Sequence, residues 1–267
     1  NSSCSDWCST NAKDGRLMMT IGSLFSGIGG LELGIETALN ARVVWQVESN
    51  PYCRKVLKRH WPDADRSVTD VREAGRDTLP RVDVIVGGFP CQGLSVAGKR
   101  KGLGDERSGL WFEFQRVLSE LRPRVAVLEN TPNVVRHLDV ITGGLVDAGY
   151  DCEWQILSAN DVGAPHLRKR WFCIAYLPDS SGHSLLLKSR RKGGAGWSSE
   201  ADAPRNGKSK RVARSTSGAQ WWSTEPNVGR VADGVRHRMD RHRGLGNAVV
   251  PQCSYAVGER VREVLCD

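Results

Sequence analysis

A proline-cysteine pair near the middle of the chain is the strongest candidate for a nucleophile. Pro90 and Cys91 stand in the run 88–92 (GFPCQ), directly after an apolar stretch that is expected to form a strand. A cysteine that follows a rigid proline at a strand end is placed for exposure rather than for packing. Attack by sulfur requires the thiolate, so a nearby cation or a helix N-terminus would have to lower the pKa of this thiol. The alternative is a buried structural cysteine, which is the common fate of a free thiol.

Two further groups could act on a substrate held near this cysteine. Glu129 ends the apolar run 124–128 and could exchange a proton with a substrate if it is partly buried. Arg168 and Arg170 are two residues apart on an expected strand, so their guanidinium groups would share a face and suit a phosphate or a flipped base. Each feature also has an ordinary alternative, namely a helix-capping or ion-paired glutamate and a pair of surface arginines.

Glycines and acidic residues in the first third of the chain indicate an adenosine site. The run 25–30 (FSGIGG) joins an expected strand to an expected helix and lets a ligand approach backbone N–H groups. Glu48 ends the next strand, where a carboxylate suits a ribose diol but repels phosphate. Asp70 could accept a hydrogen bond from an adenine amino group. Because the helix start carries no phosphate-binding lysine, the pattern fits S-adenosylmethionine, although a glycine-rich turn without a ligand explains it equally well.

Alternating short apolar strands and amphipathic helices would position these groups. We expect strands at 20–25, 42–47, 82–86, 124–128, 152–159 and 171–176, and helices at 29–39, 51–61, 108–121, 138–148 and 249–265. This alternation predicts an α/β fold with a doubly wound, mostly parallel sheet. Ligands of such sheets bind at the carboxyl ends of the strands, where the candidate residues fall.

Composition and charge exclude several classes of protein. The 267 residues are 39% hydrophobic and 25% charged, and no apolar run approaches the roughly 20 residues that span a bilayer. The 8 cysteines are scattered without zinc-ligand spacing, so we expect neither a metal site nor a disulfide framework. The net charge of +8 comes mainly from the last third of the chain, which fits a polyanionic partner or, equally, a solvated basic tail.

Three segments stand apart from this alternation of strands and helices. Residues 1–18 are polar and aperiodic, and we expect them to be a disordered or non-native leader before Met19. Residues 178–220 are rich in Ser, Gly, Lys and Arg and cannot form much core. Gly246 and Asn247 predict a tight turn before the last helix, with Asn247 as the helix cap.

Taken together, these segments resemble the C5-cytosine-specific DNA methyltransferase family in both order and spacing. The resemblance rests on five motifs, which are 25–30 (FSGIGG), 88–92 (GFPCQ), Glu129-Asn130, Arg168-x-Arg170 and 246–249 (GNAV). It implies the Rossmann-like fold of S-adenosylmethionine-dependent methyltransferases, with a small variable insert for target recognition.

The resemblance also implies a division of the chain. The catalytic domain would cover 19–176, a partly disordered target-recognition segment 177–236, and a final segment 237–267 would return to the catalytic domain beside the first motif. Two positions depart from the usual family pattern, since Thr131 replaces a valine and His166 replaces a glutamine.

By the same resemblance, individual residues receive roles. Those that would bind S-adenosylmethionine are Phe25, Ser26, Gly27, Gly29, Gly30, Glu48, Asp70, Val71, Asn247 and Ala248. Those that would surround the cytosine are Pro90, Cys91, Glu129, Arg168 and Arg170. Those that would contact the DNA are Gln92, Ser95, Lys99, Arg100 and Lys101. Phe25 would stack on the adenine, Glu48 would hold the ribose, and Asp70 would meet the adenine edge.

The implied activity is that of a DNA (cytosine-5-)-methyltransferase. A methyl group would pass from S-adenosylmethionine to carbon 5 of a flipped-out cytosine in duplex DNA, through a covalent Cys91 adduct, while Glu129 acts at ring nitrogen 3 and Arg168 orients the base carbonyl. An enzyme acting on tRNA and a catalytically silent DNA-binding relative remain as alternatives. We expect a cytoplasmic monomer that needs neither a metal nor a membrane. A cognate restriction endonuclease would be a partner consistent with the family.

Overall fold

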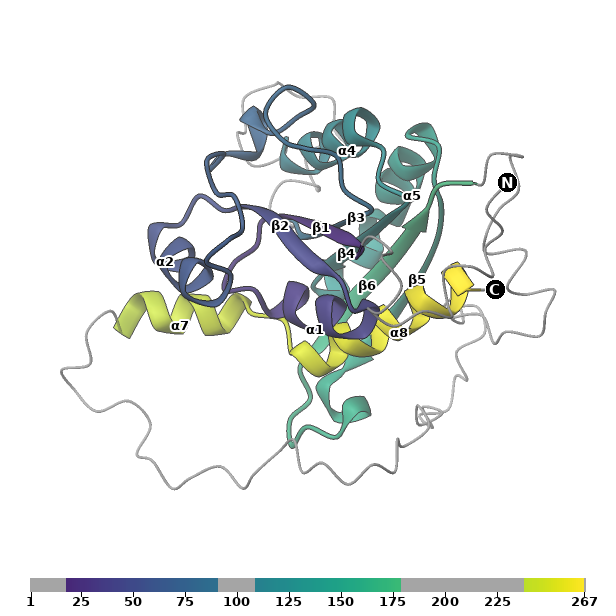
Figure 1. Ribbon diagram of the computed structural model, residues 1–267. Coiled ribbons are helices and arrows are strands. Elements are labelled where there is room, and N and C mark those ends of the chain that lie inside the picture. Colours follow the sequence, from purple (N-terminus) through teal and green to yellow (C-terminus); the bar gives the residue numbers. More distant parts are fainter. Residues whose placement is uncertain (1–17, 91–108, 179–237, 267) are drawn as a thin grey trace, which may run out of the picture.

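The computed structural model describes residues 18–90, 109–178 and 238–266, whose fold is drawn in Figure 1. Residues 1–17 of the predicted leader and nearly all of the predicted target-recognition segment lie outside them. So do six predicted site residues, which are Cys91, Gln92, Ser95, Lys99, Arg100 and Lys101.

A six-stranded sheet forms the centre of the fold. Its strands are β1 (Thr20–Leu24), β2 (Arg42–Val47), β3 (Val84–Gly88), β4 (Val125–Asn130), β5 (Asp151–Ser158) and β6 (Lys169–Tyr176). They lie in the order β2-β1-β3-β4-β6-β5, in which β1 to β4 pair in parallel and β6 runs antiparallel to both of its neighbours. The predicted mostly parallel α/β sheet is confirmed.

Helices cover both faces of this sheet (Figure 1). The helices of the described residues are α1 (Gly30–Leu39), α2 (Pro51–His60), α4 (Leu110–Leu121), α5 (Leu138–Asp147), α7 (Arg238–Asn247) and α8 (Pro251–Cys266), with short 3-10 helices at η2 (Val71–Glu73), η3 (Pro132–His137) and η4 (Ala159–Val162). α4 and α5 pack on one face, and α1 and α8 on the other. The central strands are therefore apolar on both sides: Ile85 faces the first core, while Val84 and Val86 face the second.

The close packing of α1 and α8 brings the two ends of the described chain together. A side chain at Gly34 would collide with the Ser254 hydroxyl and the Pro251 carbonyl, so the backbones approach more closely than any other residue would allow. Ser254 Oγ also donates to the Gly30 carbonyl at 3.0 Å. The last helix thus buttresses the glycine-rich loop that precedes α1.

A buried ion pair fastens the same helix to the far edge of the sheet. Arg260 Nε on α8 lies 2.8 Å from Glu153 Oε1 on β5, and Arg260 Nη2 donates to Glu153 Oε2 at 3.2 Å. Both side chains are almost completely buried. None of the helices in the described ranges is both long enough and apolar enough to cross a lipid bilayer.

One predicted element has a different secondary structure from the one expected. Gly246 and Asn247 do not form a turn that caps the last helix, because both belong to α7, and α8 begins only at Pro251. The sequence of α7 is polar and has no apolar stripe, so periodicity could not reveal it. Its helix is supported instead by a contact across the chain, in which Gly244 is buried against Ile28 and Tyr52.

Candidate cofactor and substrate cleft

A cleft of about 680 Å³ opens where β1 to β4 end at their carboxyl ends. Its walls come from the loops after these strands, from the turn η2 and from the connection between α7 and α8. The predicted site residues that line it are Phe25, Ser26, Gly27, Gly30, Glu48, Asp70, Val71, Pro90, Glu129, Arg170, Asn247 and Ala248. The structure therefore brings together residues that lie more than 200 positions apart in the chain.

The glycine-rich loop after β1 forms the floor of the cleft. Phe25 has a φ of 55°, a left-handed conformation that is strained for a bulky residue, and its ring stacks on Phe114 with centroids 6.4 Å apart. Gly27 is also left-handed, with a φ of 56°, and a Cβ there would meet nothing within 4 Å. Gly29 turns the chain into α1 and does not itself line the cleft, because it faces Trp61. The loop leaves its backbone open to a ligand above Gly27.

Glu48 ties two walls of the cleft together. Its Oε2 accepts the Gly27 N–H at 2.7 Å, and its Oε1 accepts the Asn50 N–H at 2.7 Å. Burial raises the pKa of Glu48, while these backbone donors act in the opposite direction. Each carboxylate oxygen keeps a lone pair that could accept from a ligand hydroxyl.

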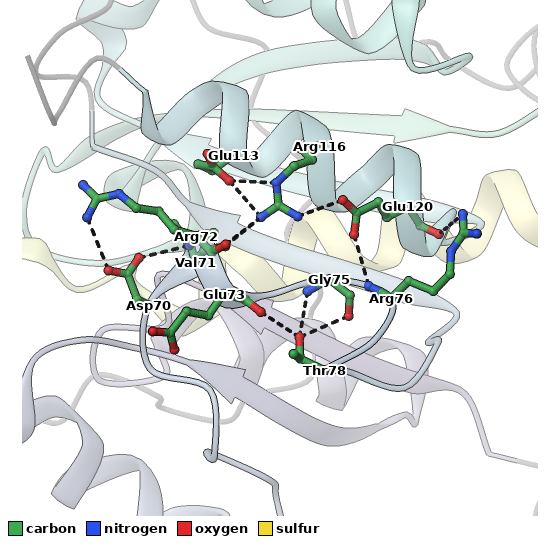
Figure 2. A network of polar contacts seen from close by, with 10 residues as sticks. All are labelled: Asp70, Val71, Arg72, Glu73, Gly75, Arg76, Thr78, Glu113, Arg116 and Glu120. Carbon is green, nitrogen blue, oxygen red and sulfur yellow. Dashed lines mark hydrogen bonds and ion pairs between the residues drawn. The ribbon is translucent and has the colours of Figure 1, made fainter. Parts of the chain in front are cut away.

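Asp70 and Val71 stand at the other wall, where η2 begins. Asp70 Oδ1 accepts the Arg72 N–H at 3.0 Å and so caps the turn, and Oδ2 lies 3.4 Å from Arg72 Nη1 (Figure 2). The Val71 side chain is buried in the core between the sheet and α4. This wall therefore offers an oriented carboxylate on a turn that is anchored from behind.

Glu129 lies near the end of β4 and is the candidate proton donor in the cleft. It is 7% exposed, and its Oε1 lies 2.9 Å from Arg170 Nε. Burial raises the pKa of Glu129 to about 7, even though Arg170 and Arg168 favour the charged form. A Cβ at Gly88 would come within 2.8 Å of Glu129 Oε2, so any side chain there would displace this carboxyl group. A carboxyl group with a pKa near neutrality can both donate and accept a proton.

Arg168 and Arg170 differ in the contacts that they make. Arg168 precedes β6 rather than lying on it, and its Nη2 donates to the carbonyls of Gly246 and Ala248, each at 2.6 Å. It lines a neighbouring groove instead of the cleft. Arg170 alone faces the cleft beside Glu129, and Arg168 holds the connection from α7 to α8 that forms the opposite wall.

Asn130 is a site residue to which sequence reasoning gave no role. Its Nδ2 donates to the Phe89 carbonyl at 2.8 Å, and its Oδ1 accepts the Thr131 N–H at 2.8 Å. It is buried, and it thereby fixes the peptide that leads into Pro90. The sequence did contain a signal for this role. Asn130 directly follows an apolar strand and an acid, and a buried amide needs hydrogen-bond partners to offset the cost of its burial.

A profile of the C-5 cytosine-specific DNA methylase family matches residues 19–218. The chain belongs to this family. The family predicted from the sequence motifs is thereby confirmed.

Curated type II methyltransferases are similar to part of the chain. The type II methyltransferase M.CviJI of Paramecium bursaria Chlorella virus IL3A is 34% identical over 168 residues, which cover 61% of this chain and 45% of that protein. M.HhaI of Haemophilus parahaemolyticus is 31% identical over 161 residues, which cover 58% and 48%. The chain thus spans about half the length of the curated relatives it matches.

Solved structures agree with the architecture. A putative DNA modification methyltransferase encoded within an Escherichia coli prophage aligns with a TM-score of 0.50 and 29% identity, over 60% of this chain and 47% of that chain. A DNMT2 mutant of Spodoptera frugiperda aligns with a TM-score of 0.53 and 22% identity, over 61% and 51%, a likeness that supports the fold alone.

Within the residues that the structure describes, this chain has no group of three or more His, Cys, Asp or Glu side chains that could hold a metal ion. The predicted nucleophile and the predicted DNA contacts, which are Cys91, Gln92, Ser95, Lys99, Arg100 and Lys101, lie outside the described residues. The cleft nevertheless contains Pro90, the residue directly before Cys91.

Proposed function

We propose that the cleft binds S-adenosylmethionine and a cytosine side by side, and that the protein methylates carbon 5 of cytosine in duplex DNA. The observation that carries the proposal is the buried pair of Glu129 and Arg170, which shares one cleft with the carboxylates of Glu48 and Asp70. Family membership supports the reaction class. Because the chain spans about half the length of its relatives, the proposal is restricted to the binding and the reaction in this cleft.

The cleft residues fit an adenosine cofactor without phosphates. Phe25 offers an aromatic face, Glu48 offers acceptors for a ribose diol, and Asp70 offers an acceptor for an adenine amino group. Two carboxylates in one cleft would repel a phosphate chain, whereas the sulfonium cofactor carries a positive charge. The open space above Gly27 lets the ligand approach the backbone. When bound, S-adenosylmethionine supplies an electrophilic methyl group.

The protein's own groups would prepare the cytosine for that methyl group. The Cys91 thiolate adds to ring carbon 6, and Glu129 delivers a proton to ring nitrogen 3, so that carbon 5 gains enamine character. Arg170 would stabilise the Glu129 carboxylate once that proton has left. After methylation a base removes the carbon 5 proton, nitrogen 3 returns its proton to the Glu129 carboxylate, and expulsion of the Cys91 thiolate restores the aromatic ring.

A cytosine inside a duplex cannot reach this cleft, so the base would have to leave the stack. Extrusion costs a few kcal/mol, which contacts to backbone phosphates can offset. We propose that Gln92, Ser95, Lys99, Arg100, Lys101 and the basic segment 177–236 supply these contacts. A restriction endonuclease is the proposed functional partner, since the relatives carry the names of type II methyltransferases.

A methylation assay on duplex DNA, with tRNA as the competing substrate, tests the proposal. Bisulfite sequencing of the product should show 5-methylcytosine in DNA, and the Cys91→Ser and Glu129→Gln variants should lose at least about 100-fold in rate. A duplex containing 5-fluorocytosine should form a covalent adduct with the wild-type protein and none with Cys91→Ser. Methylation of tRNA alone would refute the assigned substrate, and undiminished methyl transfer by Cys91→Ser would refute the nucleophile.

A further inference from the structure

A guanidinium group behind the cleft connects helix α4 to the turn that carries Asp70. Arg116 lies in the middle of α4, and its Nη2 donates to the carbonyls of Val71 at 3.1 Å and Arg72 at 3.4 Å (Figure 2). The side chain reaches the cleft wall from the side that faces away from the cavity, since Arg116 is not among the residues that line it.

Two glutamates hold this guanidinium in place. Glu113 Oε2 accepts from Arg116 Nε at 2.8 Å, and Glu120 Oε1 accepts from Nη1 at 2.9 Å. The two acids stand three residues before and four residues after Arg116, so they flank it on one face of the helix. Nη2 also lies 2.8 Å from Glu113 Oε2, and with the planar fork held by both glutamates this nitrogen reaches the turn as well (Figure 2).

The peptide group between Val71 and Arg72 transmits this constraint to Asp70. Its carbonyl accepts from Arg116, and its N–H donates to Asp70 Oδ1 at 3.0 Å. A peptide group is planar, so fixing its carbonyl also fixes the direction of its N–H. The orientation of the Asp70 carboxylate therefore depends on an arginine that does not line the cleft.

We propose that Arg116 is a positioning residue that selects adenine in the cleft, by holding the Val71–Arg72 peptide and through it the Asp70 carboxylate. The inference rests on the proposed binding of S-adenosylmethionine and names the residue that sets its base selectivity. Asp70 would accept from the exocyclic amino group of adenine. Hypoxanthine carries an oxygen at that position, and an oriented carboxylate would repel it.

Binding of two products to the full-length protein tests this inference. Isothermal titration calorimetry would compare S-adenosylhomocysteine with S-inosylhomocysteine, whose bases differ in carrying the amino group or the oxygen. We expect the wild-type protein to prefer the adenine compound by at least about tenfold. Arg116→Met should weaken binding of S-adenosylhomocysteine about tenfold and reduce the preference to less than about threefold. Asp70→Asn should do the same, and the double variant should lose no more than Asp70→Asn alone, because both changes remove one interaction.

Two further variants separate positioning from general loosening of the wall. Arg76→Met is the matched control, because Arg76 Nη2 donates to the Glu120 carbonyl at 3.5 Å in the same network, whereas the Val71–Arg72 peptide is held by Arg116. It should keep the wild-type preference. Arg116→Lys retains the charge between the two glutamates but lacks the fork, so it should fold and still lose the preference.

The outcomes distinguish this inference from the proposed function. A wild-type protein that binds neither product refutes the cofactor assignment itself. A wild-type protein that binds both products equally, or an Arg116→Lys variant that keeps the full preference, overturns the role of Arg116 while the cofactor assignment stands. An equal loss of preference in Arg76→Met also overturns it, because the effect would then belong to the segment as a whole.

Discussion

Replacing Glu32 by glutamine should change how the stability of the protein depends on pH. Glu32 is completely buried under the glycine-rich loop, where its Oε1 accepts from the Ser23 hydroxyl at 2.6 Å, and its Oε2 has no hydrogen-bond partner in the described structure. Burial raises the pKa of Glu32 from 4.5 to about 7, and the nearby charge of Glu48 acts in the same direction. The folded protein thus keeps this carboxyl group protonated at pH values where the unfolded chain has lost the proton.

The sign and size of the effect follow from this difference. Between pH 4.5 and pH 7 the unfolded chain binds fewer protons at this position than the folded protein, so the free energy of unfolding falls as pH rises. The fall is about 1.4 kcal/mol per pH unit and about 3 kcal/mol in all, and it ends above about pH 7. Glu32→Gln cannot ionise and lacks this loss. The variant should therefore gain about 3 kcal/mol relative to the wild-type protein between about pH 4.5 and pH 8.

Urea unfolding of both proteins at about pH 4.5, 6, 7 and 8 measures this difference. The titration of Glu129, whose pKa is also raised, occurs in both proteins and cancels when the two are compared. A difference between wild type and Glu32→Gln that stays constant within about 1 kcal/mol over this range would show that Glu32 is ionised in the folded protein. The argument from its burial would then be wrong.

Three other substitutions test the packing and the site. Gly34→Ala should cost about 1–3 kcal/mol in urea unfolding, because its methyl group meets α8, whereas Gly143→Ala, where a Cβ meets nothing within 4 Å, should be neutral or stabilising. Arg260→Met should cost about 3–5 kcal/mol by leaving Glu153 buried without its partner, and adding Glu153→Leu should restore most of the loss. Asn130→Ala frees the Phe89 carbonyl, and it should lower kcat roughly 10- to 100-fold while the Kd for S-adenosylhomocysteine, measured by calorimetry, stays the same.

The sheet and the strand-end acids were predictable because each depends on a local pattern. The run 124–128 is largely apolar and buries both of its faces, so it predicts a buried strand, and the first polar residue after it, Glu129, must emerge near a strand end. The strand continues through Glu129 to Asn130, which the apolar pattern could not show because the pairing with β6 extends it.

Contacts between distant segments were not predictable in the same way. β6 starts one residue after Arg168, and the Arg168 side chain donates to the carbonyls of Gly246 and Ala248, which the spacing of the two arginines could not indicate. α7 itself has no apolar stripe, and Arg116 reads in the sequence as an ordinary charged residue on a helix. Such roles depend on which segments meet in space, and periodicity carries no information about that.

The seating of α8 against α1 makes the order of synthesis matter. Gly30 and Ser254 form a hydrogen bond although 224 positions separate them. During synthesis the glycine-rich loop is therefore made long before α8, which packs against it. Chains released before Pro251 would expose the apolar flank of α1 and should be substrates for chaperones or proteases. Supplying residues 238–266 as a separate peptide to such a truncated chain should restore binding of S-adenosylhomocysteine, since close packing at Gly34, the Ser254–Gly30 hydrogen bond and the Arg260–Glu153 ion pair are all non-covalent.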